Sequence, residues 1–116
     1  MRREEDSHQR ALVQWLEWRR LRFCHVPNGG ARSKIEACIL KGLGVRRGVP
    51  DILVFSRSPW LIGHGKFGVA IEMKSAIGRV SPEQREWIEG LSGCGWVTAV
   101  CRSSGEAIRF LQEHGY

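Results

Sequence analysis

Two short apolar segments, at 52–55 and 68–74, constrain the fold more than any other feature of the sequence. The first is a continuous run of Ile, Leu, Val and Phe, which is typical of a buried strand. Segments with the 3.6-residue spacing of amphipathic helices lie before, between and after such runs. A chain that mixes these patterns buries its apolar surface by packing helices on a sheet. We therefore expect an α/β fold with a mixed central sheet flanked by helices on both sides.

The order of the predicted elements is α-β-α-β-β-α-β-α. In the first helix Leu12, Val13, Trp15 and Leu16 form the apolar stripe, and Ser81 with Gln84 forms a capping box at the start of the third helix. In the second helix the inward residues are predicted to be Ile35, Cys38, Ile39 and Leu43. The predicted ranges are helix 5–21, strand 23–26, helix 33–43, strand 52–55, loop 56–66, strand 68–74, helix 82–92, strand 96–101 and a last helix that begins with the capping box Ser103 to Glu106.

Composition places the chain among ordinary globular proteins. Its 116 residues fit one domain, 1–116, and 42% hydrophobic residues argue against disorder. A net charge of +6 favours a polyanionic partner, and nucleic acid is the leading candidate. No apolar run is long enough for a membrane span or a signal core, so we expect no membrane association. The four cysteines have no C-x-x-C spacing and are predicted to be reduced thiols that are mostly buried.

The chemistry-bearing residues are Asp51, which follows Pro50, and the pair Glu72 and Lys74, which lies twenty residues further along. Along a strand, side chains alternate between faces, so Glu72 and Lys74 project together from one face. We expect Asp51, at the start of the neighbouring strand, to lie beside them.

Two adjacent carboxylates repel each other, and a hard divalent cation removes that conflict. Mg²⁺ is usually held by one or two carboxylates together with water and phosphate. Asp51 and Glu72 supply such a pair, and the backbone carbonyl of Met73 is a further candidate ligand. The ion can activate a water and neutralise charge on a phosphoryl transition state, while Lys74 positions the water or contacts the phosphate. This set predicts hydrolysis of phosphodiester bonds.

The pattern Pro-Asp…Glu-x-Lys resembles that of the restriction-endonuclease-like PD-(D/E)xK nucleases. The surrounding residues resemble more narrowly the VRR-NUC domain family, in its stand-alone phage or bacterial form. The resemblance covers about residues 4–113 and rests on four stretches: Pro27-Asn28-Gly29-Gly30, residues 41–51 (KGLGVRRGVPD), Ile71-Glu72-Met73-Lys74 and Val80-Ser81-Pro82-Glu83-Gln84.

By position, the resemblance implies that Asp51 and Glu72 bind metal and that Lys74 is the catalytic lysine. It implies that Gln84 faces the active site, although the same residue also serves the predicted capping box. It further implies an acid near the start of the first helix that takes part in catalysis and reaches the metal through water. We assign this acid to Glu5, with Glu4 and Asp6 as alternatives.

The resemblance also implies a restriction-endonuclease-like fold and an endonuclease that uses Mg²⁺, or Mn²⁺ in its place. It implies a homodimer that cuts branched DNA, like a Holliday-junction resolvase, in the cytoplasm of a bacterial or phage-infected cell. An exposed apolar residue of the first helix, such as Trp18, is a candidate for the dimer surface.

Basic residues before the catalytic strand are candidates for contacts with phosphates. Two roles are open for the turn that contains Asn28 and Gly29: a purely structural turn, or one whose amides approach a phosphate. The predicted nucleic-acid-binding residues are Asn28, Gly29, Arg32, Lys41, Arg46 and Arg47. Two other functions remain open at this point: a module that binds DNA junctions without cutting them, and an RNA-directed nuclease on the same fold.

Overall fold

The structure, a computed structural model, describes residues 2–27 and 33–116. Of residues 2 and 3 it describes only the backbone. Five helices and four strands lie in these ranges. No helix of this part of the chain has the length and apolar character needed to cross a membrane. The elements are α1 (Arg2–Trp18), β1 (Phe23–His25), α2 (Lys34–Gly42), β2 (Ile52–Val54), α3 (Pro59–Gly63), β3 (Val69–Met73), α4 (Pro82–Gly93), β4 (Val97–Cys101) and α5 (Ser104–Glu113).

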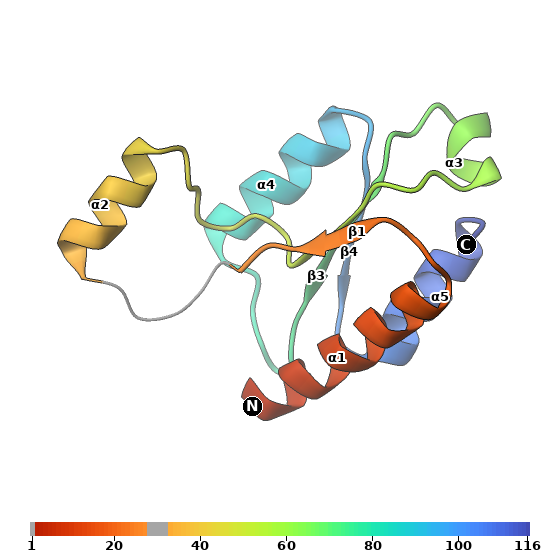
Figure 1. Cartoon of the computed structure of the whole chain (residues 1–116), viewed down its shortest axis with the longest axis horizontal. Helices are drawn as coiled ribbons and strands as arrows, with labels where there is room; N and C mark the ends of the chain where they lie inside the picture. Colours follow the sequence, from red (N-terminus) through yellow and green to blue (C-terminus); the bar gives the residue numbers. More distant parts are fainter. Residues whose placement is uncertain (1, 28–32) are drawn as a thin grey trace.

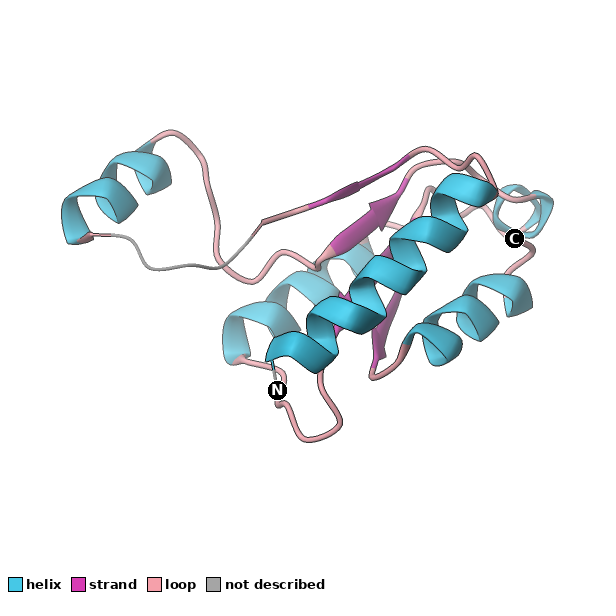
Figure 2. Ribbon diagram, turned by 60° about the horizontal axis from the view of Figure 1, so that its bottom comes forward, coloured by secondary structure: helices cyan, strands magenta, loops and turns pink. Residues whose placement is uncertain are grey.

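The four strands form one mixed sheet in the order β1-β2-β3-β4. β1 pairs with β2 and β2 with β3 in antiparallel fashion, whereas β3 and β4 run parallel. The parallel pair needs a crossover connection, and α4 supplies it. Helices α1 and α5 lie on one side of the sheet and α4 on the other (Figures 1 and 2). The predicted fold class is therefore confirmed.

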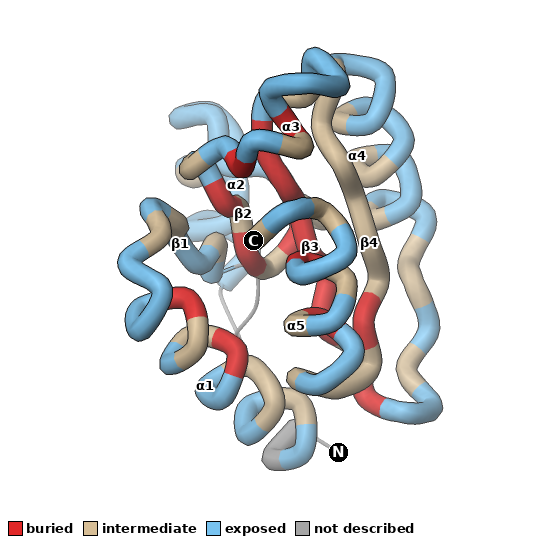
Figure 3. Tube along the Cα trace, turned by 90° about the vertical axis from the view of Figure 1, so that its right-hand side faces the viewer, coloured by how far each residue is buried: buried red, intermediate tan, exposed pale blue. Residues whose placement is uncertain are grey.

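The core lies between the sheet and the pair α1 and α5. Leu12 and Leu16 of α1 and Leu111 of α5 are fully buried against β2 and β3, in the periodic positions that the sequence indicates. All five residues of β3 are buried, which makes it the central strand of the layer (Figure 3). This burial holds the ends of β2 and β3 in fixed positions.

The predicted order of elements is confirmed, with one short helix added. Helix α3 interrupts the segment 56–66, which we predicted to be a loop. Ser58 caps this helix by accepting a hydrogen bond from the amide of Leu61, and Pro59 takes its first position. The starting signal was present in the sequence, but five residues are too few to show a helical apolar period.

The prediction that α2 turns an apolar face inward is wrong. None of its residues is buried, Ile35 and Ile39 are 76% and 59% exposed, and the following Leu43 is 77% exposed. The helix stands away from the sheet and its covering helices (Figure 1). Its apolar residues do lie on one face, as predicted, but no described part of the chain covers that face.

The prediction that the cysteines are mostly buried is also wrong. Only Cys101, at the end of β4 next to β3, is buried, and burial raises the pKa of its thiol to about 12. Cys24 lies on the edge strand β1, Cys38 on α2, and Cys94 at the end of α4, and all three are exposed. These three thiols are exposed because they lie on an edge strand, on a helix with no buried residue, and at the end of a helix.

Leu16 and Trp18 of α1 offer a matched test of this core. Leu16→Ala should lower the free energy of unfolding by about 2–5 kcal/mol, because it leaves a cavity under the sheet. Trp18 is 75% exposed, so Trp18→Ala should change stability by no more than about 0.5 kcal/mol. Urea denaturation measures both, and equal losses in the two variants would contradict the described core.

Candidate active site

The register of the sheet brings Asp51 and Glu72 together. Ile52 pairs with Ile71 at the end of the antiparallel β2 and β3 ladder, so the residues one step beyond, Asp51 and Glu72, face each other. Oδ2 of Asp51 accepts a hydrogen bond of 2.8 Å from the backbone amide of Met73. The two carboxylates predicted to be neighbours therefore are neighbours.

Glu72 is the most buried charged side chain of the site, with 3% of its surface exposed. Its Oε2 accepts a hydrogen bond of 3.0 Å from the side-chain amide of Gln84, and Nζ of Lys74 lies 3.6 Å from the same oxygen. Its Oε1 is buried and has no hydrogen-bond partner. An unpartnered buried carboxylate oxygen is costly, which marks this atom as one that a missing positive group would satisfy.

The electrostatics of the pair follow from burial and like charge. Burial, and then the charge of Asp51, raise the pKa of Glu72 to about 8. Burial also raises the pKa of Asp51, against the opposing effect of the hydrogen bond from Met73. Each carboxylate therefore resists ionisation in the folded protein until a cation offsets its charge.

Gln84 has both of the roles considered for it. Its backbone amide donates to the hydroxyl of Ser81, and its Oε1 accepts from the amide of Ser81, which completes the capping box. Its Nε2 remains to hold Glu72. Gly48 lies against the start of α4. Its φ is +90°, and a Cβ there would lie 2.6 Å from the carbonyl carbon of Glu83, so this position requires glycine.

Glu5 reaches the site from α1. Its Oε1 accepts a hydrogen bond of 3.1 Å from the amide of Ser75, the residue after Lys74. The guanidinium of Arg102 donates to the carbonyls of Ser75 and Gly78, so it holds the following loop. Of the three acids considered at this helix start, Glu5 is the one that contacts the catalytic strand.

His25 belongs to the site although we assigned it no role from the sequence. Its Nδ1 lies 2.9 Å from the backbone carbonyl oxygen of Asp51 and 3.0 Å from Nε2 of Gln9. The pairing of β1 with β2 brings it there, since His25 lies opposite Ile52. Only a prediction of that pairing would have identified it.

The basic residues predicted to bind nucleic acid are not all gathered at this site. Lys41, Arg46 and Arg47 are exposed on α2 and the segment that leads from it to β2. The guanidinium of Arg46 also donates to the carbonyls of Lys41 and Val45, so it helps to close the end of α2. Asn28, Gly29 and Arg32 lie outside the described residues.

The donor set fits magnesium better than zinc. Within the described residues, no three His, Cys, Asp or Glu side chains gather as a closed metal cage would require. Two carboxylates with an unsatisfied oxygen are the usual protein contribution to a Mg²⁺ site, whose other ligands are water and phosphate. Asp51 and Glu72 could therefore hold a Mg²⁺ or Mn²⁺ ion.

Comparison with known proteins gives the family of the chain and a similar fold. The family model described as the VRR-NUC domain matches residues 3–105. A solved structure titled "VRR_NUC domain protein" is similar in fold, with a TM-score of 0.73 and 24% sequence identity over 96% of this chain and 87% of that one. No curated protein matches the sequence.

The raised pKa of Glu72 makes the stability of the metal-free protein depend on pH. The folded state holds this proton up to about pH 8, whereas the ordinary pKa of glutamate is 4.5. Unfolding in this window releases the proton, so the free energy of unfolding should fall as pH rises from 4.5 to 8. Urea denaturation in EDTA measures this slope.

Glu72→Gln keeps the shape of the side chain and removes the proton, so it should flatten most of that slope. A contribution to the slope remains in this variant, because the pKa of Asp51 is also raised. The control is Glu89→Gln on the exposed surface of α4, which should keep the wild-type slope. Equal slopes in Glu72→Gln and wild type would contradict the electrostatics described here.

Proposed function

Because the chain belongs to the VRR-NUC domain family, a group with a nuclease-type fold, we propose that it is a metal-dependent endonuclease that hydrolyses phosphodiester bonds in DNA. One observation carries the proposal most directly. The buried, unpartnered Oε1 of Glu72 lies in a site where Asp51 and Lys74 converge, and that combination suits a cation and a phosphate at once.

In this proposal Asp51 and Glu72 hold Mg²⁺, or Mn²⁺ in its place, with the backbone carbonyl of Met73 as a further ligand. When bound, the ion supplies Lewis acidity toward a water and the scissile phosphate. Gln84 keeps Oε2 of Glu72 in place, which fixes the direction of the ligand oxygens. Glu5 holds the end of the strand through Ser75 and reaches the ion through water.

Lys74 acts on the substrate in this proposal. Its side chain is 14% exposed, so its ammonium group is partly withdrawn from water yet open to a ligand. It already lies beside Oε2 of Glu72, and a phosphate oxygen can replace that contact. We assign to Lys74 the positioning of the attacking water and the stabilisation of negative charge on the phosphate.

We further propose that the exposed cations near α2 contact the DNA backbone. Lys41 is exposed near the end of α2, Arg47 is exposed on the segment that leads to Asp51, and the guanidinium of Arg46 donates to the carbonyl of Lys41. Asn28, Gly29 and Arg32 are proposed to add to this surface. Contacts of this kind position a substrate without reading its sequence, which suits selection of branched DNA by shape.

The assembly that we propose is a homodimer formed through α2. A nine-residue helix is too short to be stable in isolation, and its apolar face needs a cover. Ile35, Ile39 and Leu43 form a face that can pack against the same face of a second copy, as two-fold symmetry requires. Two copies would also supply the two active sites needed to cut both strands of a junction.

A cleavage panel tests the activity. Duplex, flap, fork and four-way junction DNA, with a matched RNA duplex, are incubated with wild type in Mg²⁺, Mn²⁺ or EDTA. We expect cleavage of branched DNA with either ion and none in EDTA. Glu72→Gln and Lys74→Ala should each lower the rate by about 100-fold or more, because the first removes a ligand of the ion and the second removes the cation that acts on the phosphate.

Glu89→Gln again serves as the matched control and should cleave at the wild-type rate. Binding of junctions without cleavage under every divalent ion would show a binding module instead. Preferential cleavage of the RNA duplex would show an RNA-directed nuclease.

Sedimentation analysis tests the dimer. Wild type should sediment at twice the mass of one chain, and Ile39→Asp at the mass of one chain, because a charge on the apolar face cannot be buried without a partner. Ile62→Asp, on the exposed surface of α3 at 58% exposure, is the matched control and should remain a dimer. A monomeric wild type, or a dimeric Ile39→Asp, would contradict this assembly.

A further inference from the structure

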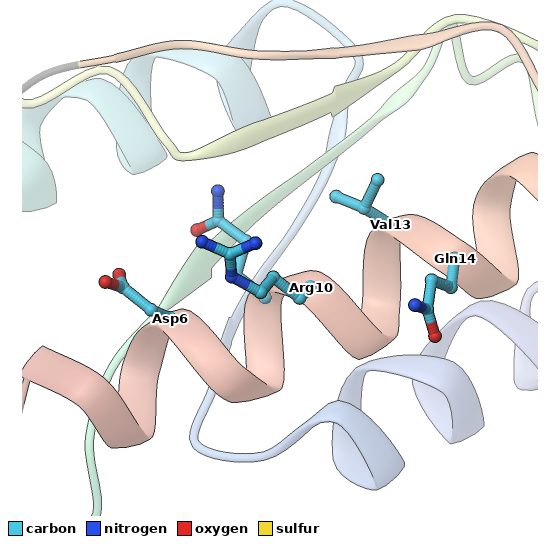
Figure 4. A pocket seen from close by; sticks show the side chains of 5 residues that line it. Asp6, Arg10, Val13 and Gln14 are labelled. Carbon is cyan, nitrogen blue, oxygen red and sulfur yellow. The ribbon is translucent and has the colours of Figure 1, made fainter.

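An open groove lies along α1, beside the candidate active site. It has a volume of about 480 Å³ and is lined by Asp6, Gln9, Arg10, Val13 and Gln14. These residues recur every three or four positions, so they occupy one side of the helix. Figure 4 shows Arg10 and Val13 projecting from α1 toward the strands.

Two chains of contacts lead from α1 to the backbone of the candidate active site. At one end, Glu5 precedes the groove residue Asp6 and bonds to the amide of Ser75. Along its side, Gln9 contacts the ring of His25, and that ring contacts the backbone carbonyl of Asp51. A substrate whose scissile phosphate lies at Asp51 would therefore place a neighbouring nucleotide at the groove.

The chemistry of the lining differs from that of a phosphate site. It combines a cation, a carboxylate, two amides and an apolar side chain, so it offers both hydrogen-bond donors and acceptors. Asp6 and Arg10 are one helical turn apart but form no ion pair, and no hydrogen bond joins Gln14 to another described residue. These polar groups are therefore available to a ligand.

The edge of a nucleobase carries the matching pattern of donors and acceptors. Arg and Gln each pair with base edges through two hydrogen bonds, and Asp accepts from an amino group. Val13 adds an apolar surface for the base or sugar. The size lies in the range of small-ligand pockets, about 300–1,000 Å³, which is room for one nucleotide.

We propose that the α1 groove binds an unpaired nucleotide of the DNA next to the bond that is cut, an inference that rests on the proposed nuclease function. Arg10 and Gln14 contact the base, while Gln9 and His25 form the wall between the base and the active site. The Watson–Crick edge of a base is free only in an unpaired nucleotide, so a groove that binds this edge favours forks, flaps and gaps over duplex.

His25 is a positioning residue in this arrangement. When Nδ1 carries a proton it donates to the Asp51 carbonyl, and this bond orients the ring relative to the catalytic strand. When Nδ1 carries no proton it instead accepts from Nε2 of Gln9, so this nitrogen hydrogen-bonds either to Asp51 or to the groove residue Gln9. Occupation of the groove and alignment at Asp51 are thereby coupled through one side chain.

Binding of 2-aminopurine DNA in EDTA tests the groove without cleavage. The probes are a duplex with a two-nucleotide gap opposite 2-aminopurine and the same duplex fully paired. Wild type should bind the gapped probe more tightly and change its 2-aminopurine emission. The double variant Arg10→Ala with Gln14→Ala should bind it about tenfold or more weakly and leave that emission unchanged, with little loss on the paired duplex.

The matched control is Arg109→Ala with Gln112→Ala, which removes the same two residue types from the exposed surface of α5 and should behave as wild type. Equal weakening on gapped and paired DNA, or no weakening, would overturn the groove proposal. If the selective loss is found but no DNA is cut with any divalent ion, the groove stands and the proposed nuclease function fails. If cleavage is found without the selective loss, the nuclease function stands and the groove proposal fails.

Discussion

The burial of two carboxylates side by side is the interaction on which the rest of the structure depends. Removing Asp51 and Glu72 from water, and holding like charges together, both disfavour the folded state. The surrounding groups limit that cost without abolishing it: an amide from Met73, an amide from Gln84 and the ammonium of Lys74. One oxygen of Glu72 remains without a hydrogen-bond partner, which suits the cation that we propose for this site.

Such a site requires a rigid frame, and the sheet provides it. Asp51 directly precedes β2 and Glu72 lies in β3, and both strands contribute residues to the core: Ile52, Val54, Val69, Ile71 and Met73. Gln84 comes from the start of α4 and Glu5 from the start of α1, on opposite sides of the sheet. The groups of the candidate site therefore come from four elements that pack on one sheet, which is how precise geometry is maintained without a bound ligand.

The sequence correctly predicted those features of the site that depend only on residues near one another in the chain. The alternation in 68–74 placed Glu72 and Lys74 on one strand, and the capping box at Ser81 placed Gln84. It was silent on His25, because the pairing of β1 with β2 is a long-range property that no short window contains. The α2 face shows the same limit, since an amphipathic period reveals that a face exists and not whether the chain itself covers it.

The division between a packed body and an exposed α2 has a consequence for the proposed function. The carboxylates and their supports lie in the body, whereas Ile39 and the cations Lys41 and Arg47 lie on α2 and its connection to β2. If a second copy covers the apolar face, it also fixes the direction of those cations relative to both active sites. Dimerisation and DNA binding would then be linked, because each orders the same segment and so lowers the entropic cost of the other.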